Sequence, residues 1–291
     1  MRPKRLACSR AASIAPEIRP EIRTDIRVSL AMRWQQTIIA ICLALALLSP
    51  AHVSYAAAGP SHGVDDPRAQ EIVDQAARLF SSNSSIATVK MQVSNEDGQR
   101  NLTMKIWSLG EKVLVRIDGP QDQAGTAILK VGRDIWYYLP KTRRTVKLPT
   151  SMTMTPWMGS AFTIDDLVKE SFLTRDYSIA TSFEGKRRGV AVYEYTLTPK
   201  PEAVVVWGKI VLQIRQVNQM PAWQGYYDED GKLVRELTFA DYKKMGARLI
   251  PTQLVMRVTD KPGEQTTVVY EDISFDVPIG AETFSLPDLK Q

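Results

Sequence analysis

The stretch DIWYYLPKTRRTVKLPTSMTMTPWMGSAFTIDDLVKE, residues 134–170, decides how the rest of this chain is interpreted. It opens with an aromatic strand, Trp136–Leu139, which Pro140 ends, and a second short strand reaches Leu148. About a dozen residues with almost no charge follow, and their large apolar side chains are Met152, Met154, Trp157, Met158 and Phe162. We expect such a loop either to plug a core or to line a site for an apolar ligand, because methionine adapts to varied apolar surfaces.

The N-terminal region has the pattern of an export signal. Residues 37–49 form an apolar run of signal-peptide length, too short for the roughly 20 residues of a membrane span. Arg33 precedes the run, and Ser54-Tyr55-Ala56 places small residues where cleavage after Ala56 requires them. An uncleaved anchor is the alternative. The predicted division is residues 1–31 as a doubtful upstream extension, 32–56 as the signal peptide, 57–66 as a linker and 67–291 as a single β domain.

Charge and cysteine content narrow the classes of function. The formal net charge of +5 lies entirely in residues 1–56, so the remainder is formally neutral and has no general attraction for nucleic acid. Cys8 and Cys42 both lie in the predicted leader, which leaves no cysteine in the mature chain. An export signal without disulfides favours a periplasmic protein of a bacterial envelope.

The mature chain begins with a helical pattern and continues with strands. Asp66 is a suitable N-cap, and Pro67 suits the first helical position, so we predict an amphipathic helix over 67–80. From Ile86 on, apolar residues alternate in short runs separated by turn signals such as Gly185, which predicts an antiparallel meander. Thr163-Ile164-Asp165-Asp166 resembles a capping box that starts a short helix.

Two predicted strands carry apolar residues on both faces. In 204–215, Ile210, Leu212 and Ile214 share one face while Trp207 and Val211 share the other, and 252–258 has the same property. A sheet of this kind is covered on both sides. The sequence therefore predicts a strongly curved sheet whose open side holds the helix at 67–80 and the segment at 149–170.

The sequence lacks the usual motifs of an enzyme or a metal site. The mature chain has one histidine, His62, and no nucleophile elbow or phosphate-binding loop. The carboxylates Asp165 and Asp166 are best explained by a helix start, and Asp228–Asp230 by a hairpin turn rather than a calcium site. We therefore expect no enzymatic activity, no cofactor and no metal; a hydrolase acting through Asp165 and Asp166 is a remote alternative.

The tryptophans and methionines give the stronger signal for a binding site. The candidates for an apolar lining are Trp107, Trp136, Tyr138, Met152, Met154, Trp157, Met158, Phe162, Trp207 and Trp223. The basic residues after Pro140 are candidates for a rim that meets lipid headgroups or an acidic partner, namely Lys141, Arg143 and Arg144. The competing interpretations are a core plug for the methionines and a solvated hairpin tip for the basic residues.

Several motifs resemble the LolA-like, outer-membrane lipoprotein-sorting proteins. The resemblance spans residues 67–289 and is carried by the order and spacing of its motifs: Trp136–Pro140 with Arg143 and Arg144, the stretch Gly159–Leu167, Met220-Pro221, Tyr226–Asp228, Gly231–Leu233 and Pro251. It implies an unclosed, strongly curved antiparallel β-barrel, for which we expect about 11 strands, with helices in its mouth and an apolar cavity between them.

The resemblance also implies a function. We expect a monomeric periplasmic carrier that holds acyl chains of lipids or lipoproteins, with an inner-membrane exporter and an outer-membrane acceptor as partners and the 149–170 segment as a lid. The alternative is a structural or adaptor module of an envelope lipid exporter, with a filled core and no cavity.

Overall fold

The computed structural model describes residues 66–168, 173–203 and 205–290. The chain divides into the units Met1–Ala58 and Gly59–Gln291, and all described residues belong to the second. The predicted extension and signal peptide, and almost all of the predicted linker, lie outside the described residues, as do Lys169 and Glu170 at the end of the opening stretch.

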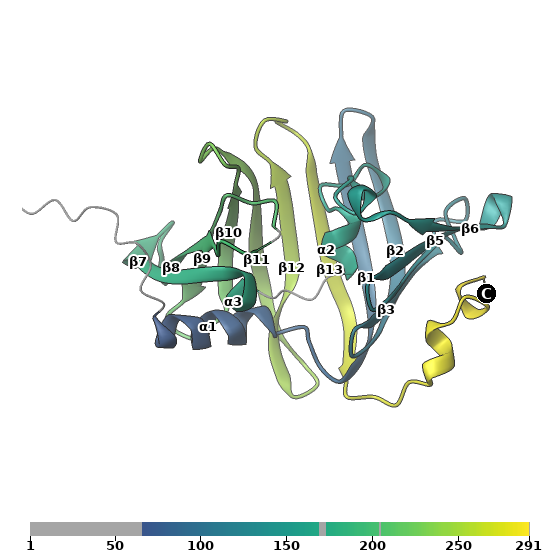
Figure 1. Cartoon of the computed structure of the whole chain (residues 1–291), viewed down its shortest axis with the longest axis horizontal. Coiled ribbons are helices and arrows are strands. Elements are labelled where there is room, and N and C mark those ends of the chain that lie inside the picture. Colours follow the sequence, from purple (N-terminus) through teal and green to yellow (C-terminus); the bar gives the residue numbers. More distant parts are fainter. Residues whose placement is uncertain (1–65, 169–172, 204, 291) are drawn as a thin grey trace, which may run out of the picture. The chain divides into compact units, whose positions relative to one another are not determined.

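One antiparallel sheet of 13 strands forms the body of the second unit (Figure 1). The strands are β1 (Ser84–Asn95), β2 (Gly98–Leu109), β3 (Lys112–Gly119), β4 (Ala127–Val131), β5 (Asp134–Leu139), β6 (Arg144–Leu148), β7 (Tyr177–Arg187), β8 (Val190–Pro199), β9 (Lys209–Arg215), β10 (Pro221–Tyr227), β11 (Leu233–Met245), β12 (Arg248–Val258) and β13 (Gln265–Phe275). The sheet curves but does not close, which confirms the expected fold class, with two more strands than expected.

The order of the strands gives the opening stretch its place in the fold. From one edge to the other the order is β6-β5-β4-β3-β2-β1-β13-β12-β11-β10-β9-β8-β7, so β6 and β7 are the two free edges although they are consecutive in the chain. Every other pair of consecutive strands is hydrogen-bonded as a hairpin. Residues 149–176, which we call the crossover, therefore carry the chain from one edge to the other. The crossover contains η2 (Thr150–Met152), η3 (Trp157–Gly159), α2 (Ile164–Val168) and α3 (Leu173–Asp176).

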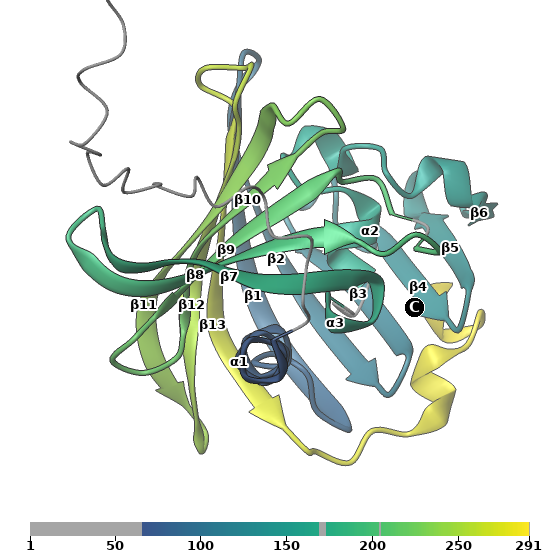
Figure 2. The ribbon, with the colours of Figure 1, turned by 60° about the vertical axis from the view of Figure 1, so that its left-hand side comes forward.

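The N-terminal helix starts where its sequence predicts and ends slightly earlier. Helix α1 spans Pro67–Ala77, and the Asp66 carboxylate accepts hydrogen bonds from the backbone N–H groups of Arg68 and Ala69. Its apolar stripe is buried against β7, β8 and β9 inside the curve of the sheet, where Figure 2 shows the helix nearly end-on. These contacts cover one half of the concave face.

Two strand boundaries differ from the prediction, and a glycine lies at each of them. The predicted turn at Gly185 is instead the interior of β7, where Gly185 has a φ of 152° and lies against the ring of Phe183. The predicted strand 204–215 begins only at Lys209. Just before it, Gly208 lies against the backbone of Asp228, where a Cβ atom would come within 2.5 Å of the carbonyl oxygen, so only glycine fits there.

The crossover covers the other half of the concave face. Trp157, Phe162, Ile164 and Val168 of the crossover are buried in one cluster with side chains of β1–β5 and β11–β13. At its end the crossover reaches the first half, where Leu173 of α3 packs with α1. Because α1 and residues 157–168 of the crossover pack on different halves of the sheet, the centre of the concave face lies between them (Figure 2).

A segment that the sequence reasoning missed covers part of the convex face. Two short helices after β13, η4 (Ala281–Phe284) and η5 (Asp288–Lys290), place Phe284 and Leu289 against Leu114, Ala127, Leu129 and Tyr138. The Arg116 guanidinium fixes this segment by donating a 2.5 Å hydrogen bond to the carbonyl oxygen of Asp288. This cluster explains why strands in this half of the sheet are apolar on both faces.

Candidate functional site

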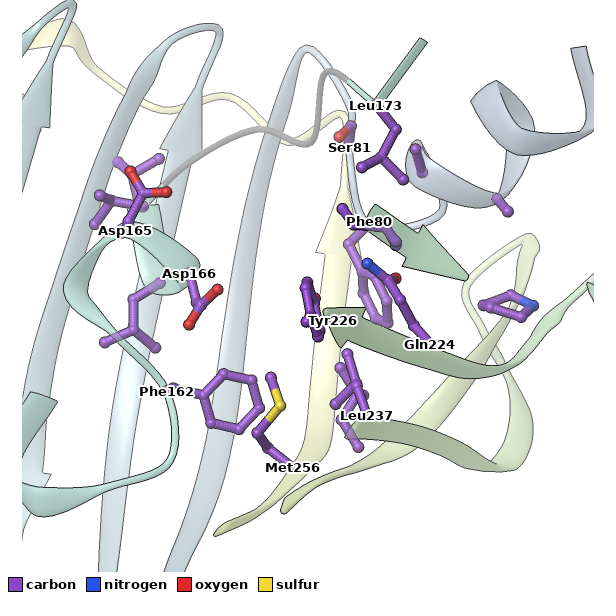
Figure 3. A pocket seen from close by; sticks show the side chains of 18 of the residues that line it. Phe80, Ser81, Phe162, Asp165, Asp166, Leu173, Gln224, Tyr226, Leu237 and Met256 are labelled. Atoms are coloured by element: carbon purple, nitrogen blue, oxygen red, sulfur yellow. The ribbon is translucent and has the colours of Figure 1, made fainter. Parts of the chain in front are cut away.

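A cavity of about 690 Å³ lies between α1, the crossover and the concave face of the sheet. Ala76, Ala77 and Phe80 line it from the α1 side, and Met154, Phe162 and Leu167 line it from the crossover. The sheet contributes residues of β1–β3, β7 and β9–β13, including Ile106, Leu212, Leu254 and Tyr270. Figure 3 labels four more of them, Gln224, Tyr226, Leu237 and Met256. Most of these side chains are apolar, so the cavity suits an apolar ligand.

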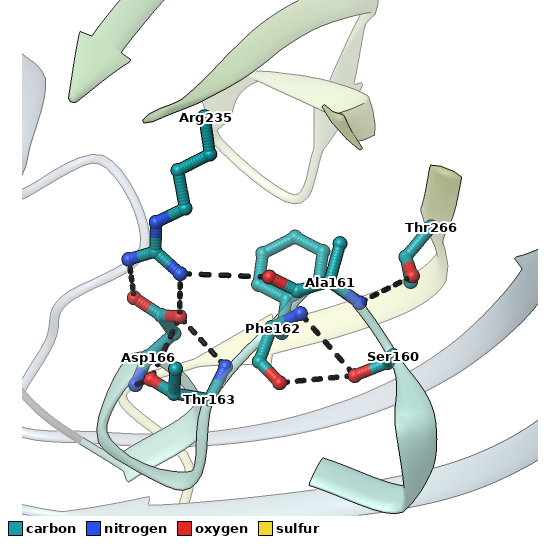
Figure 4. Close-up of polar contacts among 7 residues, drawn as sticks. All are labelled: Ser160, Ala161, Phe162, Thr163, Asp166, Arg235 and Thr266. Carbon is teal, nitrogen blue, oxygen red and sulfur yellow. Dashed lines mark hydrogen bonds and ion pairs between the residues drawn. The ribbon is translucent and has the colours of Figure 1, made fainter. Parts of the chain in front are cut away.

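A capping box orients the crossover helix beside the cavity. The Thr163 hydroxyl accepts a 3.1 Å hydrogen bond from the backbone N–H of Asp166, and the Asp166 carboxylate accepts a 2.8 Å bond from the backbone N–H of Thr163 (Figure 4). Two N–H groups that the first turn of α2 would leave unsatisfied are thereby paired. This confirms the predicted capping box, with aspartate in the place of glutamate.

A buried ion pair joins this helix to the sheet. Arg235 of β11 donates two hydrogen bonds to the Asp166 carboxylate, at 2.7 and 2.8 Å, and only 5% of Arg235 is exposed (Figure 4). Burial alone would lower the pKa of Arg235, but the neighbouring Asp166 outweighs it and the pKa is raised. Asp166 therefore serves both as a helix cap and as the partner of a buried cation.

Two aromatic rings complete the surroundings of Arg235. Its guanidinium lies 4.7 Å from the ring centroid of Trp207 and 4.6 Å from that of Tyr226, and both rings line the cavity. Such cation–π contacts are stronger away from water. Arg235 was not among the predicted site residues; the only signal for it in the sequence is its position on the face of β11 shared with Leu237 and Phe239.

Only three of the ten predicted lining residues reach the cavity, namely Met154, Phe162 and Trp207. Trp157 and Met158 pack in the core between the crossover and the sheet, as the plug interpretation expected. Met152 points away from that core, with 47% of its surface exposed. The crossover is therefore partly plug and partly lining.

The other four predicted lining residues lie on the convex face, which corrects their placement. Trp107, Trp136 and Tyr138 pack with the C-terminal segment. Trp223 lies beside Glu236 and donates a 2.8 Å hydrogen bond from its indole Nε1 to that carboxylate. Alternation along a strand sends neighbours to opposite faces, so Ile135 and Tyr137 face the core under the crossover while Trp136 and Tyr138 face away.

The predicted basic rim lies at the tip of the β5–β6 hairpin. Lys141, Arg143 and Arg144 are exposed there, and none of them lines the cavity. Arg143 has a φ of 52° at the end of η1 (Pro140–Thr142). The structure supports the solvated hairpin tip and places no headgroup rim at the mouth of the cavity.

Two of the carboxylates considered for metal binding or hydrolysis, Asp166 and Asp228, have structural roles. Asp166 is engaged by Arg235 and Thr163, and Asp228 accepts a hydrogen bond from the backbone N–H of Lys232 across its hairpin turn. Among residues 66–168, 173–203 and 205–290, no group of three or more histidine, cysteine or acidic side chains could hold a metal ion. Within the same residues, no helix combines the length and apolar character needed to cross a membrane.

Tyrosines around the cavity predict a loss of stability at high pH. Burial raises the pKa of both Tyr177 and Tyr270 from 10.0 to about 12, with a contribution from Asp176 at Tyr177. Below pH 10 both are protonated in the folded and unfolded states, and between about pH 10 and 12 only the unfolded chain ionises. We expect the free energy of unfolding, measured by urea titration, to fall across this range. The Tyr177→Phe/Tyr270→Phe variant should show a shallower fall, and an identical fall would contradict the assignment.

Comparisons with known proteins agree with this architecture. A family profile described as an uncharacterized protein matches residues 110–291. The solved structure of a Vibrio parahaemolyticus domain classed as an outer membrane lipoprotein-sorting protein is 28% identical, covers 77% of this chain and 99% of that domain, and has a TM-score of 0.67. The chain belongs to the LolA-like family. No curated protein matches it.

Two further structures show the same fold for this LolA-like protein. A LolA superfamily protein from Nitrosomonas europaea is 22% identical, with a TM-score of 0.63 and coverage of 76% of this chain and 98% of that one. A DUF1329 family protein from Desulfovibrio piger is 20% identical, with a TM-score of 0.68 and the same two coverages. The resemblance found in the sequence motifs is thus confirmed at the level of family and fold.

Proposed function

We propose that this LolA-like protein is a non-enzymatic periplasmic carrier that binds the acyl chain of a lipid or lipoprotein and moves it toward the outer membrane. The observation that carries the proposal is the apolar cavity of about 690 Å³ between α1, the crossover and the sheet. Its volume falls within the roughly 300–1,000 Å³ of small-molecule sites. The lipoprotein-sorting description of the Vibrio parahaemolyticus domain supports the direction of transport.

The energetics of burial suit an acyl cargo. Each methylene removed from water contributes about 0.8 kcal/mol, so ten methylenes contribute about 8 kcal/mol before the cost of association is subtracted. Apolar burial is not directional, which suits a carrier that must accept a chain from one membrane partner and pass it to another. We propose an inner-membrane exporter as donor and an outer-membrane acceptor, with export through the predicted signal peptide.

The alternative adaptor role has less support from the geometry. It required the crossover to fill the interior, and Trp157 and Met158 do fill one half of the concave face. Met154, Phe162 and Leu167, however, border the cavity. The space that remains between α1 and the crossover favours a carrier.

Fluorescence titration tests the proposal. A pyrene-labelled methyl ester of hexadecanoic acid, added to the detergent-free protein, should bind saturably at one molecule per chain with a micromolar or lower dissociation constant. An unlabelled hexadecanoyl ester should displace it. An absence of saturable binding would refute the carrier function and favour the adaptor.

A further inference from the structure

Gln224 is a polar side chain in an apolar part of the cavity wall. It lies on β10, where the sheet register places it directly between Leu212 of β9 and Leu237 of β11, and all three line the cavity. Gln224 is only 8% exposed, none of the described residues pairs with its amide, and the amide atoms are not fully enclosed by protein but open to the cavity. An amide side chain offers two donor hydrogens and an acceptor oxygen. These groups face the cavity without a protein partner, so they are available to a ligand that enters it.

Tyr226 adds a second hydrogen-bonding group on the same face. It follows Gln224 by two residues on β10, and Figure 3 shows both side chains at the cavity wall. Burial raises the pKa of Tyr226, which the nearby Arg235 only partly offsets, so its phenol stays protonated at neutral pH. Its hydroxyl also lacks a hydrogen-bond partner among the described residues. One amide and one phenol thus lie on one strand, next to apolar side chains of the neighbouring strands.

The charges around the cavity disfavour an anionic group in this place. Among its described lining residues are three aspartates and no lysine, arginine or histidine. Arg235 pairs with Asp166, and Arg175 pairs with Asp176 at 2.8 and 2.9 Å. A carboxylate or phosphate drawn into the cavity would find no cationic side chain among the described lining residues, and an unpaired buried charge is strongly unfavourable.

We propose that Gln224 and Tyr226 form a hydrogen-bonding subsite that selects acyl ligands by an uncharged ester, amide or hydroxyl group next to the chain. The Gln224 amide donates to the carbonyl oxygen of an ester or amide and accepts from an amide N–H or a hydroxyl, and the Tyr226 hydroxyl supplies a second donor. Free fatty acids are rejected, and so are acyl chains whose phosphate would lie beside Gln224 and Tyr226. The subsite deepens the proposed carrier function and rests on it.

Competition between matched ligands tests this selectivity. Palmitamide and palmitate, which share one chain and differ in charge, displace the pyrene-labelled methyl ester from the detergent-free protein at pH 8. We expect the wild-type protein to bind palmitamide at least about tenfold more tightly than palmitate. In Gln224→Leu, palmitamide should bind about three- to tenfold more weakly with little change for palmitate, because one neutral hydrogen bond contributes this much. Tyr226→Phe should show a smaller loss of the same sign.

The matched control is Gln213→Leu on the neighbouring strand. The Gln213 amide donates a 2.8 Å hydrogen bond to Glu194, and Gln213 is not among the residues that line the cavity, so its loss should leave the preference for palmitamide intact. Gln224→Leu should also melt at the same temperature as the wild type or higher, since it replaces an amide that pairs with none of the described residues by an apolar side chain between Leu212 and Leu237. Gln224→Met serves if the leucine variant does not fold.

The outcomes separate the subsite from the carrier function. If the methyl ester binds but wild-type protein does not distinguish palmitamide from palmitate, or if Gln224→Leu and Gln224→Met keep the preference, the subsite is refuted and the carrier function stands. If no hexadecanoyl ligand binds, both proposals fail.

Discussion

Replacing Arg235 by methionine should lower the free energy of unfolding by about 3 kcal/mol. The change leaves the Asp166 carboxylate without its cation in a site where its side chain is only 18% exposed, and breaking a buried pair costs about 3–5 kcal/mol. We take the lower end because water reaches Asp166 in part. For a domain of this size the melting temperature should fall by about 6–12 °C, measured by differential scanning calorimetry.

An exposed ion pair provides the control for Arg235→Met. Lys147 lies 2.8 Å from Asp134, with 58% and 46% of the two side chains exposed, and such pairs contribute about 0–1 kcal/mol. Lys147→Met should therefore change the melting temperature by no more than about 4 °C. The double variant Arg235→Met/Asp166→Leu should recover much of the loss, because it removes the uncompensated charge. Equal effects of Arg235→Met and Lys147→Met would show that the pair does not anchor the crossover.

Replacing Ile106 by tryptophan should weaken acyl binding by at least about tenfold. Ile106 lies on the concave face of β2 and lines the cavity, and a strand fixes the direction of its side chain. The larger ring would occupy volume that the ligand needs, and the displaced methylenes lose about 0.8 kcal/mol each, so two of them account for more than tenfold. The measurement is the titration with the pyrene-labelled methyl ester.

Thr103→Trp on the same strand is the matched control. Its side chain projects from the face opposite Met104 and Ile106, so the substitution adds the same bulk outside the cavity. It should leave the dissociation constant within about twofold, which is well under 1 kcal/mol. Calorimetry of both variants shows whether each remains folded. Unchanged binding in a folded Ile106→Trp variant would mean that the ligand does not enter between α1 and the sheet.

Local signals in the sequence were sufficient for much of the fold. Asp66 and Pro67 start α1, and Thr163 with Asp166 starts α2, because a capping residue acts on backbone groups within one turn of itself. The alternation of apolar residues predicted the antiparallel meander, since pairing between consecutive strands needs only a short turn. All consecutive strands pair except β6 and β7, which form the two edges of the sheet, so the crossover has to join these edges.

The candidate site was less accessible from the sequence because it depends on which face of each strand is concave. Trp136 and Tyr137 are neighbours with similar character, yet only Tyr137 faces the core under the crossover. Nothing local to the strand indicates that a segment from Ala281 to Lys290 covers the opposite face. Residue type correctly indicated burial for Tyr138 and Trp223 but not the surface against which they are buried.

The polar residues of the site were missed for a related reason. Arg235 and Gln224 each occupy a single position in an apolar strand, where sequence alone predicts an exposed side chain. Their importance comes from partners far along the chain: Asp166 lies 69 residues before Arg235 and caps a helix of the crossover. Only the folded arrangement brings that carboxylate to the sheet.

Lipid analysis of the native protein tests the central claim most directly. The protein is purified from the periplasm without detergent, its mass is measured under non-denaturing conditions, and the extracted lipid is identified by mass spectrometry. The carrier function predicts one bound acyl lipid per chain in the wild-type protein and its loss in Ile106→Trp. Wild-type protein that carries no lipid, and that gains none when incubated with the hexadecanoyl methyl ester, would contradict it.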